Sequence, residues 1–171
     1  RKRASFFRIA TIPDLQPYAT FSLLELAFKY NLVEFNTAIK STVFRYALDH
    51  LNATRVLYFD NDVWIMHSVA YIESLLTTYS IVITPHITSP MPFDGKDQAD
   101  KQIGMAGIFN FGFVAMSESP ATRAFLDWWT VRLRFYGYND KPRGMHFDQG
   151  WGNFIPAFLG HEEYFVLRDP A

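Results

Sequence analysis

Three short apolar runs, separated by stretches with helical spacing, limit the folds that this chain can adopt. The runs are rich in β-branched and aromatic residues and lie between polar segments, as buried strands do. They are RVLYF at 55–59, IVIT at 81–84 and GIFNFGFVAM at 107–116. Apolar residues recur at helical spacing at 19–30, 37–50, 69–79 and 121–135. Strands that alternate with helices predict an α/β layer fold.

Local signals set the expected boundaries of these elements. Asn36 is the expected cap of the second helix, and Pro120 is placed to open the fourth. Gly112, inside the third strand, predicts a bulge or a close approach of the backbone. Residues 89–104 contain two prolines, two glycines and many charges, so we expect a long loop there. A last helix is expected after HFDQGW, with Pro156 limiting its regularity.

The composition favours one domain and excludes several kinds of site. With 171 residues, of which 49% are hydrophobic, the chain is long enough for a single core. Its net charge of −1 gives no electrostatic reason to bind nucleic acid. Cysteine is absent, which excludes disulfides and thiolate metal sites. No apolar stretch is long enough for a transmembrane segment, so we expect a soluble domain.

Asp60 and Asp62 directly follow the first strand, at the end where α/β sheets gather their ligands. Two carboxylates one residue apart can face one hard cation, which prefers oxygen ligands and commonly bridges to substrate phosphates. Burying both charges without a cation would be costly. In the simpler alternative, Asp60 caps the next turn and Asp62 is solvated.

Two enzyme classes place Asp-x-Asp after such a strand. In sugar-nucleotide glycosyltransferases both acids hold a metal ion on the donor diphosphate. In aspartyl-nucleophile phosphatases the first Asp attacks phosphorus and the second is the acid or base. The phosphatase needs a further acidic pair at a later strand end, and none follows the 107–116 run.

Two further stretches follow the Asp-x-Asp in order, FNFGF at 109–113 and FDQGWGN at 147–153. Together with LYFDNDV at 57–63 they resemble the GT-A glycosyltransferases of the glycogenin and lipopolysaccharide galactosyltransferase type. The resemblance extends from about residue 36 to 170. It implies a GT-A mixed sheet flanked by helices and a single domain over 1–171, truncated at both ends. It also implies sugar transfer from a nucleotide-diphosphate donor.

The resemblance assigns expected roles to individual residues. Asp60 and Asp62 would be the metal ligands, with Mn²⁺ or Mg²⁺ as the cofactor. Asp148 and Gln149 would be the catalytic pair, with Asp148 binding donor-sugar hydroxyls and Gln149 near the reacting anomeric carbon. The expected substrate-binding residues are Asn110, Gly112, His86, Lys40 and Asn153.

Simpler roles remain open for several of these residues. Asn110 could satisfy a bulge, and Asp148 could cap the helix that follows it. Lys40 could be a solvated lysine, and His86 a polar residue with a structural partner. The aromatic helix that contains Trp128 is expected to be core and surface, without a role in sugar stacking.

The chain also departs from the resembled type. No strand that would bind the nucleoside precedes Arg8. His161 lacks the context of the third metal ligand, which we expect outside the chain. In FDQGWGN, Gly150 replaces an acid that is common at this position in the resembled type, so the donor preference stays open.

We therefore expect a metal-dependent glycosyltransferase with a nucleotide-sugar donor, a UDP-sugar by resemblance, and a retaining reaction. The acceptor, a glycan, lipid or protein, stays unknown, and no nucleic-acid partner is expected. The parent protein is expected in the cytoplasm or the Golgi lumen. The alternatives are the Mg²⁺-dependent phosphatase and a non-catalytic carbohydrate-binding remnant of the fold.

Overall fold

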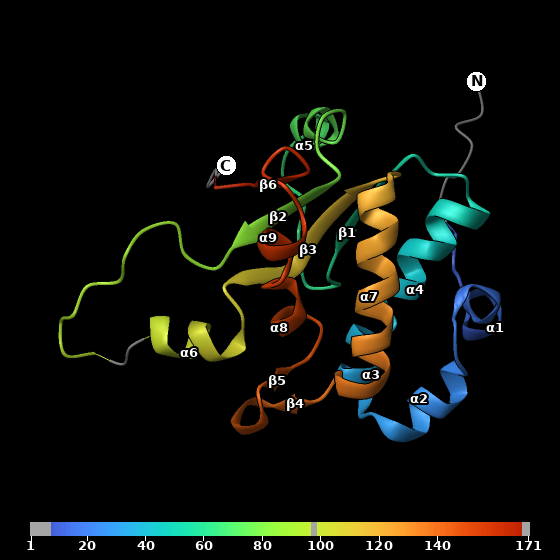
Figure 1. Cartoon of the computed structure of the whole chain (residues 1–171), viewed down its shortest axis with the longest axis horizontal. Coiled ribbons are helices and arrows are strands. Elements are labelled where there is room, and N and C mark those ends of the chain that lie inside the picture. The colour runs from blue at the N-terminus through green and yellow to red at the C-terminus, as the bar shows by residue number, and fades with distance from the viewer. Residues whose placement is uncertain (1–7, 97–98, 169–171) are drawn as a thin grey trace.

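A four-stranded mixed sheet with helices on both faces organises the computed structural model, which describes residues 8–96 and 99–168 (Figure 1). The strand order is β1-β3-β2-β6. β3 runs antiparallel to β1 and β2, and β2 runs parallel to β6. The four strands are β1 (Arg55–Phe59), β2 (Ile81–Pro85), β3 (Phe109–Ser117) and β6 (Tyr164–Val166). The expected α/β class is confirmed at the level of a mixed sheet between helices.

Short helices precede β1, and after it only α7 (Pro120–Tyr136) is long among the described helices. Before β1 come α1 (Ile12–Leu15), a 3-10 turn (Gln16–Tyr18), α2 (Leu23–Lys29), α3 (Leu32–Ala38), α4 (Lys40–Arg45) and a π-helical turn (Tyr46–His50). After β1 come α5 (Ala70–Leu75), α6 (Ala99–Ala106), α7 (Pro120–Tyr136), α8 (Gln149–Gly152) and α9 (Ile155–Phe158). A hairpin of β4 (Asn139–Asp140) and β5 (Met145–His146), joined by a 3-10 turn (Lys141–Arg143), follows α7. No helix in the described ranges is long and apolar enough to cross a membrane.

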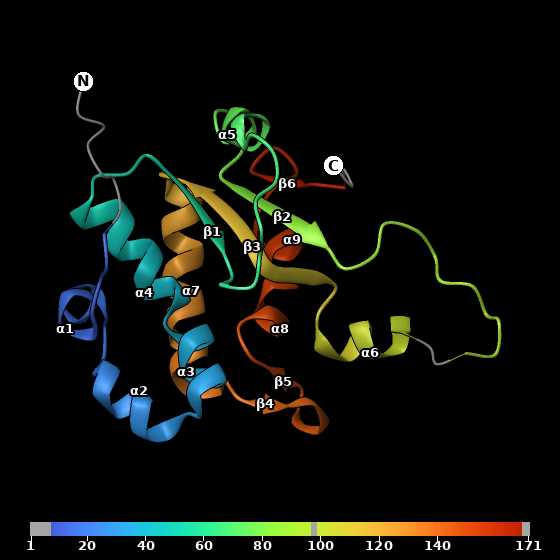
Figure 2. The same ribbon diagram turned by 180° about the vertical axis from the view of Figure 1, so that it is seen from behind.

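Alternating side chains of the central strands form two cores. Ile81 and Ile83 of β2 belong to the larger core, which contains the buried face of α7 with Trp129. Val82, between them, packs in a smaller core with Leu76. Because successive strand residues point to opposite faces, the apolar run at 81–84 supplies both cores. In Figure 2, α7 and α4 lie on one side of the sheet and α5 on the other.

Several boundaries differ from those expected. The helix expected at 37–50 begins at Leu32, where Asn31 caps it instead of Asn36, and it breaks at Ile39. The loop expected at 89–104 contains most of α6. The helix expected after HFDQGW is divided into α8 and α9, with Pro156 in the first turn of α9. Pro120 opens α7, as expected, and Ser119 caps the helix.

β1 was expected to be a buried strand, and this prediction is wrong. β1 pairs with β3 alone among the described strands, and its residues are half-buried or exposed. Its apolar composition reflects packing on both faces, since Val56 and Tyr58 contact the larger core and Leu57 contacts the smaller one.

The bulge expected at Gly112 is present. Ile83 and Thr84 are adjacent in β2, but their partners in β3 are Val114 and Asn110, so β3 leaves the ladder between these two positions. Such bulges re-aim side chains at sheet edges. Here the bulge directs the backbone of Gly112 toward the end of β1, where Asp60 N–H donates to the Gly112 carbonyl at 2.8 Å.

Tyr30 is expected to make unfolding sensitive to alkaline pH. Its hydroxyl donates to the Leu133 carbonyl at 2.7 Å and accepts from Gly137 N–H at 3.0 Å, and burial raises the pKa of Tyr30 to about 12. Because the folded-state pKa lies above the ordinary value of 10.0, stability from this group is complete below pH 10 and is lost as pH rises toward about 12. Tyr30→Phe should remove this dependence and lower the unfolding free energy by about 1–3 kcal/mol. Urea denaturation from pH 8 to 12 measures both effects, and an unchanged alkaline slope in Tyr30→Phe would contradict the assignment.

Candidate functional site

The carboxyl ends of β1, β2 and β6 meet at one edge of the sheet. β1 and β2 are both antiparallel to β3, and β6 is parallel to β2, so these three strands share one direction. Asp60 follows β1, His86 follows β2, and Asn110 lies at the start of β3 on the same edge. This is the edge at which open α/β sheets bind ligands.

A buried lysine lies at the centre of the polar groups here. Lys40 is 2% exposed, and its Nζ lies 2.8 Å from Asp148 Oδ2 and 3.2 Å from Asp60 Oδ1. Nζ also donates to the Phe111 carbonyl at 2.8 Å. A buried ammonium needs such partners, because removing its charge from water is costly. The alternative of a solvated Lys40 is wrong, and its three donors are directed at protein oxygens in this structure.

Tyr58 was missed by the sequence reasoning. Its hydroxyl donates to Asp60 Oδ1 at 2.7 Å, and its ring lies 4.6 Å from Lys40 Nζ. Burial raises the pKa of Tyr58 well above its usual value, and the hydrogen bond to Asp60 and the nearby carboxylates raise it further. Tyr58 precedes Asp60 by two residues, so the two-residue period of a strand places them on one face. That spacing was the signal available in the sequence.

Gly112 and Asn110 are tied to each other by the bulge. Asn110 Oδ1 accepts from Gly112 N–H at 2.8 Å, which is the simpler role left open for Asn110. A Cβ on Gly112 would lie 3.0 Å from Asn110 Oδ1 and 3.4 Å from Asp60 Oδ2. The glycine therefore allows three groups to approach closely at the end of β1.

Asp148 is another partner of Lys40, and neighbouring residues fix its position. Phe147 before it has φ +49°, a left-handed conformation that is uncommon for a bulky residue. Trp129 Nε1 of α7 donates to the Asp148 carbonyl at 3.2 Å. Asp148 is 2% exposed and occupies the N-cap position of α8, but its side chain makes no capping hydrogen bond, so a side-chain cap is not its role. Burial raises the pKa of Asp148, and the Lys40 charge opposes the shift.

Gln149 and Asn153 join α8 to the segment between α6 and β3. Gln149 Nε2 donates to the Ala106 carbonyl at 3.2 Å, and Asn153 Oδ1 accepts from Ile108 N–H at 2.9 Å. Gly107 has φ +123°, and a Cβ there would lie 3.0 Å from the Gln149 carbonyl. These contacts fix the FDQGWGN stretch against the residues directly before FNFGF. The ligand roles of both amides stay predictions.

Asp62 and His86 lie outside the Lys40 cluster. Asp62 is exposed and makes no hydrogen bond or ion pair with the described residues. His86 N–H donates to the Ile108 carbonyl at 3.0 Å, while its Nδ1 is buried without a partner in the described part of the chain. His146 has its pKa lowered by burial first, then by Lys141 and His86.

The residues at the end of β1 suit a hard cation with only two protein ligands. No group of three or more His, Asp or Glu within residues 8–96 and 99–168 could hold a metal ion. Asp60 Oδ1 is engaged by Tyr58 and Lys40, but Oδ2 accepts no hydrogen bond from a described residue. A cavity of about 330 Å³ between α3, α4 and β1 reaches Asp60 and Asn61. Mg²⁺-type sites commonly use one or two carboxylates, with water and substrate phosphates completing the shell.

Comparisons with protein-family models, curated proteins and solved structures found no match for this chain.

Proposed function

We propose that the chain forms a metal-dependent glycosyltransferase domain of the GT-A type that uses a nucleotide-diphosphate sugar. The observation that carries the proposal is the convergence of the three motif stretches. Lys40 contacts Asp60 of LYFDNDV, the Phe111 carbonyl of FNFGF and Asp148 of FDQGWGN, all within 3.2 Å. The three stretches are far apart in sequence, so a shared contact is a stronger sign of one site than their order alone.

The carboxylates at the end of β1 support a role for Mn²⁺ or Mg²⁺. Asp60 Oδ2 and the exposed Asp62 carboxylate would supply two oxygen ligands. A Cβ on Gly112 would lie 3.4 Å from Asp60 Oδ2, so the glycine keeps that oxygen uncrowded. When bound, such an ion would neutralise the charge that develops on the leaving diphosphate. Tyr58 and Lys40 orient Asp60 by contacting its other oxygen. A carboxylate fixed in this way loses little rotamer freedom when a ligand arrives.

The donor would be a UDP-sugar, and the transfer would retain the anomeric configuration; both expectations rest on the resemblance. The bond from the anomeric carbon to the diphosphate oxygen breaks, and a bond from the acceptor hydroxyl oxygen to that carbon forms. The hydroxyl proton passes to the leaving diphosphate. Asp148 is buried and paired with the Lys40 ammonium. This favours a positioning role over contact with sugar hydroxyls. Gln149 Oε1 makes no hydrogen bond with a described residue, so in this proposal it is free to face the reacting carbon. The parent protein would work in the cytoplasm or the Golgi lumen.

Mn²⁺ plus UDP is expected to stabilise the protein. At a free ligand concentration one hundred times Kd, binding adds about 2.7 kcal/mol to the free energy of unfolding. For a domain of this size that corresponds to a rise in Tm of about 5–10 °C. Asp62→Asn should abolish the rise, because it removes one ligand charge without adding bulk. Differential scanning calorimetry with Mn²⁺ alone, UDP alone and both together measures the effect.

Asp94→Asn, which removes another exposed acid, is the matched control and should retain the full shift. No shift in the unsubstituted protein, or a full shift in Asp62→Asn, would contradict the donor site. Phosphate release from p-nitrophenyl phosphate that depends on Asp60 would indicate the phosphatase. Glycan binding that needs no metal would indicate the carbohydrate-binding module.

A further inference from the structure

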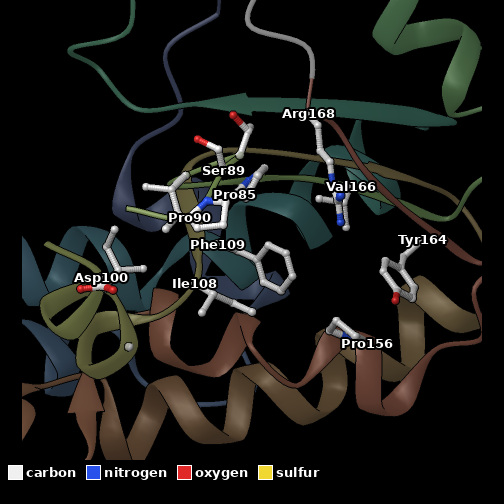
Figure 3. Close-up of a pocket in the computed structure, with 14 residues that line it drawn as sticks. Pro85, Ser89, Pro90, Asp100, Ile108, Phe109, Pro156, Tyr164, Val166 and Arg168 are labelled. Carbon is white, nitrogen blue, oxygen red and sulfur yellow. The ribbon is translucent and has the colours of Figure 1, made fainter. Parts of the chain in front are cut away.

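A second cavity lies at the same edge of the sheet, beside the polar cluster. It has a volume of about 570 Å³, within the range of roughly 300–1,000 Å³ for small-molecule sites. Its walls come from the ends of β2 and β6, the start of β3, and from α6 and α9. Figure 3 shows Ile108, Phe109, Pro156 and Tyr164 around the opening. Phe109 lines the cavity and Asn110 follows it, so β3 connects the cavity to the Asp60 cluster.

The walls of this cavity are mainly apolar, and one cationic side chain reaches it. Arg168 extends from the chain after β6 toward the cavity in Figure 3. It is exposed, and no described carboxylate forms an ion pair with it. A guanidinium with free donors favours a carboxylate, sulfate or phosphate group, because its planar fork matches these oxyanions and charge-assisted hydrogen bonds are stronger than neutral ones.

A single acid limits where the anionic group of a ligand can lie. Asp100 of α6 is on the other side of the opening from Arg168 in Figure 3. It would repel an anion near α6 and accept hydrogen bonds from hydroxyl groups there. The cavity is thus polarised, with Arg168 at one end, Asp100 at the other and apolar side chains between them.

We infer that this cavity binds a small ligand with an apolar, ring-containing body, one anionic group against Arg168 and hydrogen-bond donors toward Asp100. Binding requires neither metal nor nucleotide. If the proposed glycosyltransferase function is correct, the ligand is the acceptor, and its hydroxyl groups are the donors that face Asp100.

Gly104 allows the cavity to be filled without disturbing the fold. It lies on α6 and lines the cavity, and a Cβ added there would meet no atom within 4 Å. Leucine is also a better helix former than glycine, so Gly104→Leu should keep or slightly raise Tm. Gly104→Ala adds one methyl group and serves as the graded control.

The test uses two fluorescent probes that differ by one charge. 1-Anilinonaphthalene-8-sulfonate carries an aromatic body and one sulfonate, and N-phenyl-1-naphthylamine carries the same rings without the charge. The protein should bind the sulfonate, with amide shifts in ¹⁵N spectra at Ile103, Ile108 and Val166. Gly104→Leu should abolish this binding. Arg168→Gln should weaken the sulfonate roughly ten-fold and leave the neutral probe unchanged. Arg168→Lys should restore most of the affinity.

Three results would overturn the inference. They are absence of sulfonate binding to the unsubstituted protein, unchanged binding in Gly104→Leu or Arg168→Gln, and amide shifts centred on Trp128 and Phe158 instead of this cavity. The effect of Mn²⁺ plus UDP on Tm should be intact in Gly104→Leu. Probe binding therefore tests the cavity, and the Tm shift with Mn²⁺ plus UDP tests the donor site separately.

Discussion

Lys40→Met is expected to lower the free energy of unfolding by about 3–5 kcal/mol at neutral pH. Methionine keeps much of the length of the side chain but removes the ammonium between Asp148 and Asp60. Asp148 is 2% exposed, so its carboxylate would be left uncompensated in a low dielectric. The Phe111 carbonyl would also lose its donor. Urea denaturation measures the loss as a lower midpoint with an unchanged slope.

Two further variants separate this effect from general damage. Lys101→Met removes an exposed lysine of α6, and its effect should be within about 0.5 kcal/mol. Lys40→Met combined with Asp148→Asn should recover part of the loss, because the double variant leaves no buried charge at position 148. A loss of less than about 1 kcal/mol in Lys40→Met would contradict the central role given to Lys40.

The loss in Lys40→Met should also depend on pH. Burial raises the pKa of Asp148 above its ordinary value of 3.8 in the folded protein, and Lys40 opposes that shift. Without Lys40 the folded-state pKa rises further, so folded Asp148 takes up a proton where the unfolded chain does not. The folding free energy that comes from protonated Asp148 is fully present below the ordinary pKa of 3.8. It is lost as the pH rises through the folded-state pKa. The loss should therefore shrink as the pH is lowered from neutrality.

The strands were easier to predict than the helix boundaries. The 55–59 and 81–84 runs coincide with β1 and β2 within one residue, since β-branched and aromatic residues between polar segments indicate strands strongly. β6 has only three residues, which are too few for a strand pattern to be recognised in the sequence. The break at Ile39 lacks a glycine or proline, so nothing local marked it.

The three motif stretches were expected to belong to one site, but the contacts that join them were not predicted. The order of the three motifs indicated that Asp60, Asn110 and Asp148 belong together. It did not indicate that Lys40 would hold Asp60 and Asp148 to each other, because the register of a helix against a strand depends on packing. The burial of Asp148 likewise depends on α7 and Trp129, far from it in sequence.

Gly152→Ala is expected to destabilise the protein by about 3 kcal/mol and to disturb the Lys40 cluster. A Cβ on Gly152 would lie 2.1 Å from Phe111 Cε2, closer than any stable contact. The ring cannot move aside easily, because Phe111 is 1% exposed and packs edge-to-face with Trp129 at 5.5 Å. Alanine favours helices by about 1 kcal/mol over glycine, which offsets only part of the clash.

Gly150→Ala is the matched control, because it makes the same change in the same short helix. A Cβ on Gly150 would lie 3.9 Å from His146 Cβ, an ordinary contact, so this variant should be neutral or slightly stabilised. Urea midpoints compare the two variants, and near-UV circular dichroism reports a change in the packing of the aromatic side chains. Equal stability of Gly152→Ala and Gly150→Ala would show that the third motif does not need its second glycine for packing. A loss confined to Gly152→Ala would mean that this glycine lets FDQGWGN approach FNFGF, which brings Asp148 and the Phe111 carbonyl to the same lysine.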